Sequence, residues 1–299
     1  MSSSRLRLAG GVALHVQRWD GAGVPFLLVH GLASNLHLWD GVAQSLAERG
    51  HAVAAVDLRG HGQSDKPSHG YDFDTITDDL VELVAALGLD RPVAAGQSWG
   101  ANVVLELGWR RPALLRGMAC VDGGWIELRR RFPQWEQCAD VLAPPVAAGR
   151  PAAEIEAGLR ARHPDWPEQG IAGAMACFDR RPDGTVAPWL SFEHHLAILR
   201  SLWEHEPSSR YREIALPVLL LPAGTGTDAG LGGGGSHPAG GGGSDRWSAD
   251  RRRQVEEAAG ALPRSRVHWM AGDHDLHAQQ PDRVADLLHQ AVADGFFLP

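Results

Sequence analysis

A serine between small residues, in the sequence G-Q-S-W-G at residues 96–100, is the segment best suited to chemistry. It follows a short apolar run over residues 93–96 and precedes a helical pattern over 101–110, so it occupies a predicted strand-to-helix turn. Glycines at such a turn let strand and helix approach closely and push the serine clear of the backbone. This context predicts Ser98 as a nucleophile; the alternative is an incidental serine in a glycine-containing turn.

A nucleophilic serine needs a nearby base, and His274 is the best candidate. The sequence Gly272-Asp273-His274 follows the last predicted strand and precedes a closing helix that begins at Pro281. This position places the imidazole at the same sheet edge as Ser98, where it can accept the serine proton and return it to a leaving group. The chain has 15 histidines, so an exposed loop histidine is the alternative, and His277 is the nearest competitor.

Backbone N–H groups beside Ser98 could stabilise a developing oxyanion. His30-Gly31-Leu32 ends an earlier predicted strand, and in a doubly wound sheet that position lies beside the turn that carries Ser98. We therefore expect the N–H groups of Leu32 and Trp99 to form the oxyanion hole. His30 and Trp125 are candidates for the lining of an apolar substrate pocket.

The elements that must position these residues read as a mostly parallel sheet flanked by helices, because β-rich apolar runs alternate with helical patterns. The predicted strands cover residues 6–8, 13–19, 25–30, 52–57, 93–96, 118–122, 217–221 and 266–270. The predicted helices cover residues 36–49, 74–87, 101–110, 249–260 and 281–293, with Asp74 and Thr75 as candidate caps of the second.

The alternation stops between residues 124 and 212, where tryptophan and proline are dense. Helical stretches at 152–162 and 192–203 have no predicted strand between them, which indicates a helical cap inserted into the core. We therefore expect a first core segment at 1–123, the cap at 124–212 and a second core segment at 213–299. The last segment contains a glycine-rich stretch, 224–245, which is expected to be flexible and is either native or engineered.

Composition narrows the class of protein. Of 299 residues, 44% are hydrophobic and 21% charged, with a net charge of −8, so nucleic-acid binding has little support. Lys66 is the single lysine, which leaves no phosphate-binding P-loop. Three cysteines at no metal-like spacing, no apolar leader and no run long enough to cross a membrane fit a cytoplasmic protein. We expect no metal, no cofactor and a small-molecule substrate; the oligomeric state stays open.

These motifs together resemble the α/β-hydrolase superfamily. The resemblance rests on His30-Gly31, the segment D-L-R-G-H-G-Q-S at residues 57–64, the turn at Ser98 and the Gly272-x-His274 sequence ahead of Pro281. It covers nearly the whole chain outside the cap and the glycine-rich stretch. It implies an α/β-hydrolase fold with a helical cap and a serine nucleophile. Epoxide hydrolases and haloalkane dehalogenases share the fold but carry an aspartate at the position of Ser98.

The acid that orients His274 departs from the family's common pattern. In most members an aspartate follows the strand represented here by residues 218–221, but this turn reads P-A-G-T-G-T-D, so Asp228 is displaced into the glycine-rich stretch. Some members carry the acid at the end of the strand after the nucleophile helix, where this chain has Asp122. We favour Asp122, with Asp228 as the alternative acid and Asp245 behind both, because a flexible loop orients an imidazole poorly.

The resemblance implies hydrolysis of an ester, thioester, lactone or amide bond through an acyl-enzyme, with an apolar or aromatic substrate favoured by the tryptophan-rich cap. Acyl transfer and carbon–carbon bond cleavage, by a hydrolase or a lyase, would use the same three residues. A ligand-binding or signalling protein with little turnover is the alternative outside enzymes. The fold alone does not decide among these functions.

Overall fold

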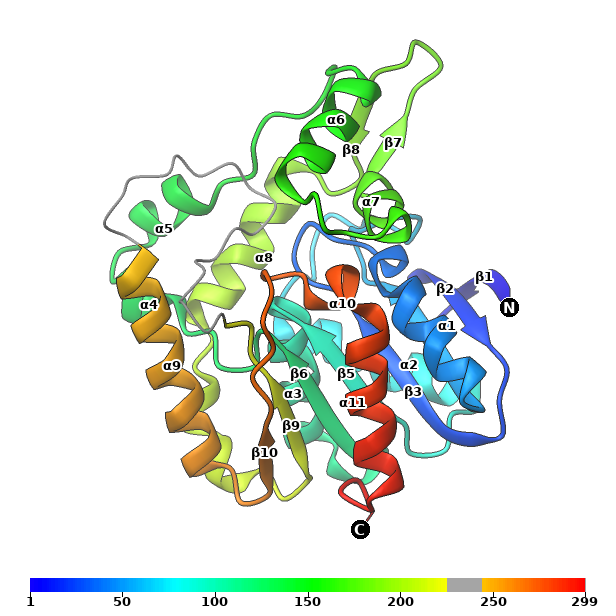
Figure 1. The fold of residues 1–299 in the computed structure, drawn as a ribbon. Helices are drawn as coiled ribbons and strands as arrows, with labels where there is room; N and C mark the ends of the chain where they lie inside the picture. Colours follow the sequence, from blue (N-terminus) through cyan, green and yellow to red (C-terminus); the bar gives the residue numbers. More distant parts are fainter. Residues whose placement is uncertain (225–243, 299) are drawn as a thin grey trace.

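The alternation of strands and helices builds one eight-stranded sheet. The computed structural model describes residues 1–224 and 244–298, without the side chains of residues 244–249. The sheet order is β1-β2-β4-β3-β5-β6-β9-β10, with β1 and β2 antiparallel to their neighbours and the rest parallel (Figure 1). The strands are β1 (Ser2–Arg7), β2 (Ala13–Trp19), β3 (Gly23–Val29), β4 (His51–Asp57), β5 (Val93–Gln97), β6 (Gly117–Val121), β9 (Val218–Leu221) and β10 (Ser265–Val267).

Helices cover both faces of this sheet because its strands are apolar on both sides. Alternate residues of the central strands, such as Leu27 and Leu28 of β3, enter opposite core clusters. One face packs against η1 (Leu36–Trp39), α1 (Asp40–Glu48), α10 (Leu276–Gln279) and α11 (Pro281–Ala293). The other packs against α2 (Phe73–Leu87), α3 (Trp99–Arg110) and α9 (Ser244–Ala261). These observations confirm the α/β-hydrolase architecture expected from the sequence.

The segment between β6 and β9 carries its own elements above the sheet (Figure 1). They are α4 (Leu128–Arg131), α5 (Trp135–Leu142), α6 (Ala152–Arg162), α7 (Glu168–Met175), β7 (Phe178–Arg180), β8 (Val186–Pro188) and α8 (Phe192–Glu204), followed by the short helices η3 (Pro207–Ser209) and η4 (Tyr211–Glu213). The short helix η2 (Pro112–Leu114) belongs to the core, between α3 and β6. We propose residues 124–212 as the extent of this cap.

The expectation of a cap without strands is wrong, because β7 and β8 form an antiparallel hairpin. Each strand has three residues, which is too short for an alternating pattern to stand out. The helix N-cap is also corrected: Asp72 caps α2, and its carboxylate accepts the N–H of Thr75 at 2.8 Å. Gly88 ends α2 in the left-handed conformation, with φ +64°.

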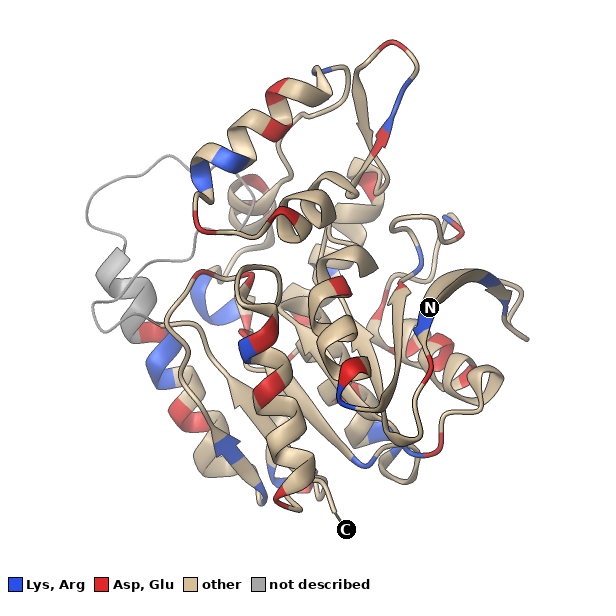
Figure 2. Cartoon of the chain, turned by 45° about the vertical axis from the view of Figure 1, so that its right-hand side comes forward, with Lys and Arg blue, Asp and Glu red and all other residues tan. Residues whose placement is uncertain are grey.

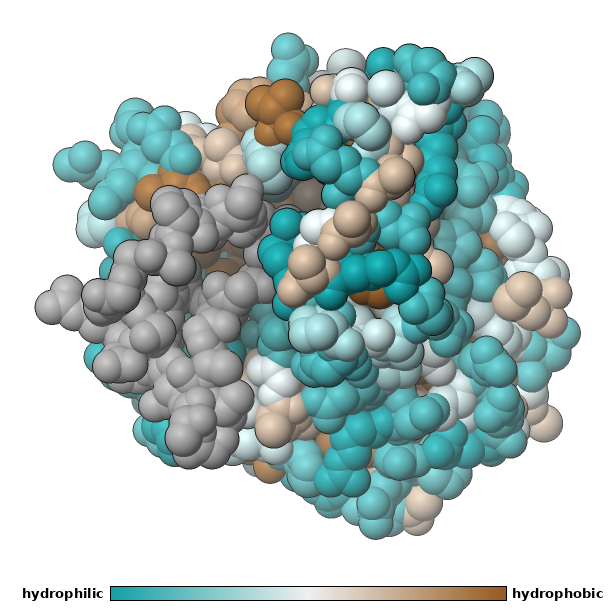
Figure 3. All heavy atoms as spheres, turned by 45° about the horizontal axis from the view of Figure 1, so that its top comes forward, coloured by the Kyte–Doolittle hydropathy of each residue, from teal (hydrophilic) through white to brown (hydrophobic). Residues whose placement is uncertain are grey.

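Apolar contacts divide the cap into two clusters. The first, which we call the rear cluster, joins Trp166 and Ile171 to Leu38 and Ala278 of the core. The second, the front cluster, gathers Phe132, Cys138, Leu199 and Trp203, and Leu32 of the core packs against it. Viewed from the cap side, the surface shows only small apolar groups among hydrophilic residues (Figure 3). The cap contacts the core through these two clusters and also through Leu190, Ile198 and Leu202, which belong to the main core cluster.

Candidate active site

Ser98 occupies a strained turn between β5 and α3, with φ 54° and ψ −122°. The flanking glycines are required by space: a Cβ on Gly96 would lie 2.2 Å from the Gly100 carbonyl oxygen, and one on Gly100 would lie 2.3 Å from that of His30. Both obstacles are backbone atoms that cannot move aside. Strain of this kind costs about 1–3 kcal/mol and is typical of functional sites. The turn therefore exposes the Ser98 hydroxyl at the carboxyl end of the sheet.

His274 lies on the loop between β10 and α10, and Asp122 follows β6. The His274 Nδ1 is 2.6 Å from the Asp122 Oδ2. The His274 side chain is 17% exposed and that of Asp122 only 1%. Burial opposes protonation of the imidazole, but the hydrogen bond and charge of Asp122 outweigh it and raise the His274 pKa above its ordinary value. This pair has the form of a general base oriented by an acid.

Several contacts fix the loop and the acid beside Ser98. The Gln97 side-chain amide donates to the His274 carbonyl oxygen at 3.1 Å, so the residue before the serine holds the histidine loop. A Cβ on Gly123 would lie 2.3 Å from the Ser98 carbonyl oxygen, so the turn after β6 packs closely on the turn that carries Ser98. In the described residues, neither Ser98 Oγ nor His274 Nε2 makes a hydrogen bond, as is common before substrate binds.

The Asp122 carboxylate is held by groups on the neighbouring strand and helix. Its Oδ1 accepts the N–H of Ala223 at 3.0 Å, just beyond β9. The Arg251 guanidinium of α9 donates to the Ala223 carbonyl at 2.7 Å and lies 3.7 Å from the same Oδ1. Asp228, the alternative acid, lies outside the described residues, as does the side chain of Asp245. The structure thus brings together Ser98, His274 and the favoured acid.

The loop after β3 lies against Ser98. A Cβ on Gly31 would be 3.2 Å from the Ser98 Cβ. Within the described part of the chain, the N–H of the next residue, Leu32, donates to no acceptor. Trp99 is the first residue of α3, where helical amides have no partner in the helix and carry partial positive charge. The two expected oxyanion donors therefore flank the serine.

His61 supports this loop and was not singled out by the sequence. Its Nδ1 faces the Arg59 carbonyl at 3.0 Å, and its Nε2 accepts the N–H of Ala33 at 3.3 Å. Burial keeps the His61 pKa well below its ordinary value, so the ring is neutral and can accept that N–H. The ring also stacks on Trp99, with centroids 5.6 Å apart. Its place in a glycine-rich turn was the available signal, but only the fold brings it to the loop.

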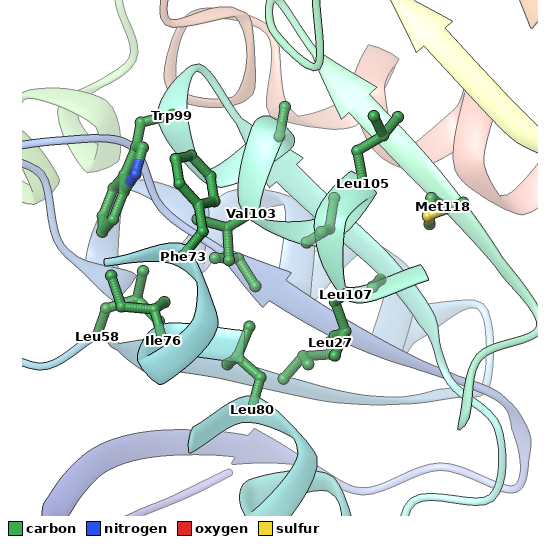
Figure 4. Packing of buried hydrophobic residues seen from close by; sticks show 14 of the residues in the cluster. Leu27, Leu58, Phe73, Ile76, Leu80, Trp99, Val103, Leu105, Leu107 and Met118 are labelled. Carbon is green, nitrogen blue, oxygen red and sulfur yellow. The ribbon is translucent and has the colours of Figure 1, made fainter. Parts of the chain in front are cut away.

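The two candidate pocket residues are largely committed elsewhere. His30 is fully buried, with its Nδ1 2.7 Å from the Gly31 carbonyl and its Nε2 accepting the N–H of Leu58 at 3.0 Å. These contacts give the His30 ring a supporting role in the loop, and its place in a substrate pocket stays a prediction. Trp125 is 4% exposed and packs in the core, so its place in a pocket stays a prediction. The Trp99 ring points into the core beside Phe73 (Figure 4), so only its backbone faces Ser98's turn.

The cap is bonded to the histidine loop. Asp273, directly before His274, accepts from the Trp166 indole N–H at 2.8 Å and from His163 Nδ1 at 3.1 Å. Burial would raise the Asp273 pKa, but these donors lower it below its ordinary value. The rear cluster of the cap is therefore hydrogen-bonded to the segment that carries His274. No group of three or more metal-ligating side chains occurs among the described residues.

Comparison with known proteins agrees with this fold. The family model of the alpha/beta hydrolase fold matches residues 24–149. A 2-(acetamidomethylene)succinate hydrolase from Mesorhizobium japonicum is 30% identical over 217 residues, 71% of this chain and 74% of that protein. The chain belongs to the α/β-hydrolase superfamily. A soluble epoxide hydrolase from Corynebacterium sp. is 36% identical over 115 residues, 38% of this chain and 40% of that protein.

Solved structures share the fold of this α/β hydrolase. The structure of E-2-(acetamidomethylene)succinate hydrolase superposes with a TM-score of 0.72 at 22% identity, covering 98% of this chain and 99% of that one. The enol-lactonase from Burkholderia xenovorans LB400 gives a TM-score of 0.68 at 16% identity, covering 97% of this chain and 100% of that one. The named relatives are hydrolases, which supports hydrolase activity for this member. In the described residues, no helix is long and apolar enough to cross a membrane.

Proposed function

We propose that this α/β hydrolase is a serine hydrolase that cleaves an ester, thioester, lactone or amide bond through an acyl-enzyme. The observation that carries the proposal is the 2.6 Å contact of His274 Nδ1 with a buried Asp122 beside the strained Ser98. An ionised carboxylate only accepts, so it requires the proton on Nδ1 and leaves the Nε2 lone pair free for the serine proton.

In the mechanism, Ser98 Oγ attacks the substrate carbonyl while its proton passes to His274 Nε2. Asp122 stabilises the imidazolium, and the N–H groups of Leu32 and Trp99 bind the oxyanion. His274 then protonates the leaving group, and a water molecule activated by the same base hydrolyses the acyl-enzyme. These steps use this chain's own side chains and backbone and require no cofactor.

The surroundings of Ser98 support an acyl group that is apolar or aromatic. Leu32, whose N–H is an oxyanion donor, packs against the front cluster of the cap. In the view of Figure 2, acidic and basic residues are interspersed along the helices, which gives little support to a highly charged polymer as substrate. Because two relatives are named for an acetamido compound and an enol lactone, small acyl amides and enol lactones are the first compounds to assay.

The test is labelling by a fluorophosphonate probe, followed by measurement of ester hydrolysis. We expect the intact chain to be labelled at Ser98, and Ser98→Ala and His274→Ala to lose both labelling at that residue and turnover. Circular dichroism must show that each variant is folded. A folded, intact chain that is neither labelled at Ser98 nor active on any acyl compound would favour the ligand-binding alternative.

A further inference from the structure

A second serine–histidine–aspartate array lies outside the proposed active site. In the β1–β2 hairpin, the Ser3 hydroxyl oxygen is 2.9 Å from His15 Nε2. The other ring nitrogen, His15 Nδ1, is 2.7 Å from Oδ2 of Asp57, the last residue of β4. The atoms that meet are of the same kinds as those of a catalytic relay. None of the three residues takes part in the mechanism described above.

The hydrogen bonds to Asp57 decide where the protons lie. The carboxylate accepts the backbone N–H of Leu36 at 2.8 Å and that of Gln63 at 3.0 Å, in addition to His15. Burial alone would raise the Asp57 pKa, but these donors hold it below its ordinary value. An ionised carboxylate is an acceptor only, so Nδ1 of His15 must carry a proton. With a single proton on the ring, Nε2 is an acceptor to which the Ser3 hydroxyl can donate.

His15 and Ser3 differ in their exposure to solvent. His15 is 3% exposed and Asp57 1%, whereas Ser3 is exposed on the edge strand of the sheet. Water therefore competes little for the buried hydrogen bond, and a reagent in solution can still reach the serine oxygen. The Ser3 hydroxyl gives His15 Nε2 a hydrogen-bond partner at the solvent side of the buried ring.

We propose that Ser3 is a second reactive hydroxyl of this chain, one that takes an acyl or phosphonyl group from activated esters and fluorophosphonates. The Ser3 oxygen attacks the carbonyl carbon of the ester while its proton passes to His15 Nε2. Asp57 stabilises the resulting imidazolium. When the tetrahedral intermediate collapses, the bond to the leaving alcohol breaks and the alcohol takes the proton from His15. The products are a Ser3 ester and the free alcohol. With a fluorophosphonate, the Ser3 oxygen attacks phosphorus, the P–F bond breaks, and fluoride leaves with the proton held by His15, which gives a Ser3 phosphonate ester and hydrogen fluoride.

This reaction should be slow and stop after one turnover. An edge strand offers unpaired backbone N–H groups to an oxyanion. Among the described residues, however, no helix N-terminus or glycine loop is arranged around Ser3 as around Ser98. Loss of a single oxyanion donor typically reduces a rate about 10²–10³-fold. General-base assistance alone contributes about 10²–10⁴-fold. Ser3 is thus expected to be a modification site that reacts far more slowly than Ser98.

The neighbouring serines provide the control. Ser2 and Ser4 lie in the same exposed strand, and neither side chain makes a hydrogen bond in the described residues. We would treat the intact chain and Ser98→Ala with a fluorophosphonate, digest both, and measure adduct formation at each serine by mass spectrometry over time. We expect Ser3 to be modified about 10²-fold faster than Ser2 or Ser4, at equal rates in both proteins.

Two variants test the relay itself. His15→Gln should reduce the Ser3 rate to that of its neighbours, and Ser4→Ala should leave it unchanged. If His15→Gln does not fold, as judged by circular dichroism, the comparison of the three serines in the intact chain still decides. Equal modification of the three serines, no adduct at Ser3, or an unchanged Ser3 rate in folded His15→Gln would overturn the proposal. Because Ser98→Ala retains the array, these results do not depend on the proposed hydrolase function.

Discussion

Replacing Asp122 with asparagine should nearly abolish turnover while preserving the fold. The Ala223 N–H donates to Oδ1 at 3.0 Å, so the oxygen of an asparagine amide must take that position. The amide nitrogen then lies where Oδ2 is now, 2.6 Å from His274 Nδ1. Because this nitrogen donates, Nδ1 must accept, and the imidazole proton moves to Nε2. Nε2, the nitrogen that should accept the Ser98 proton, then already carries a proton.

The magnitude follows from this change of tautomer. Where a serine–histidine relay has the wrong tautomer but intact geometry, kcat falls about 10⁴-fold. That corresponds to about 5 kcal/mol in the activation free energy. KM should change little, since Asp122 is buried and does not face a substrate. The assay is steady-state hydrolysis of a p-nitrophenyl ester, with thermal unfolding to show that the variant retains its fold.

Asp228→Asn is the informative comparison, because Asp228 was the alternative acid. Our reasoning requires the Asp122 variant to lose far more kcat than the Asp228 variant. An Asp122→Asn protein that keeps more than about a tenth of its kcat, together with an inactive Asp228→Asn protein, would refute it. In that event the 2.6 Å contact would be structural, and the acid would come from the segment after β9.

Three further outcomes are expected. Gly96→Ala should lower the free energy of unfolding by on the order of 3 kcal/mol, because the added Cβ would overlap backbone atoms. Gly260→Ala, which has open space around its Cβ, should not lower it. Equal urea midpoints for the two variants would mean that the Ser98 turn is loosely packed. His61→Ala should lower kcat about tenfold with little change in KM, a fraction of the loss caused by removing an oxyanion donor, and a pure KM effect would contradict this role. The His274 pKa is raised, so kcat/KM should fall as pH decreases through a midpoint above 6.5. Arg251→Met removes a positive charge that opposes protonation of His274 and should move that midpoint upward. A downward shift would contradict the influence of Arg251 on His274.

Local patterns were sufficient to predict much of the fold. The closing helix was predicted at 281–293 and occurs as α11 (Pro281–Ala293), since its apolar spacing and first-turn proline act within a few residues. The turn that carries Ser98 was also predictable from the sequence, because the close backbone approach at Gly96 and Gly100 excludes any larger side chain. Short elements were missed: β7 and β8 have three residues each, and the turn at Gly184, with φ +83°, was their main signal.

The supporting contacts of the site were beyond reach of the sequence. Arg251 meets Asp122 across 129 residues, and His61 meets Ala33 across 28. Neither pair shares a helix face or a hairpin, so periodicity gives no hint of them. The structure places Asp122 at His274, as favoured, but its catalytic role stays a prediction until the variants are measured. The full burial of His30 was not predicted, because burial of a loop histidine depends on the whole fold.

The division of the cap into two apolar clusters has a consequence for evolution. The front cluster packs on Leu32, beside the acyl group's expected place, and the rear cluster reaches the histidine loop through Trp166 and Asp273. Since the two clusters share no residue, mutations that reshape the acyl-binding side need not disturb the seating of the base. For the proposed hydrolase, we therefore expect that substitutions in the front cluster can change the substrate while the geometry around His274 is retained.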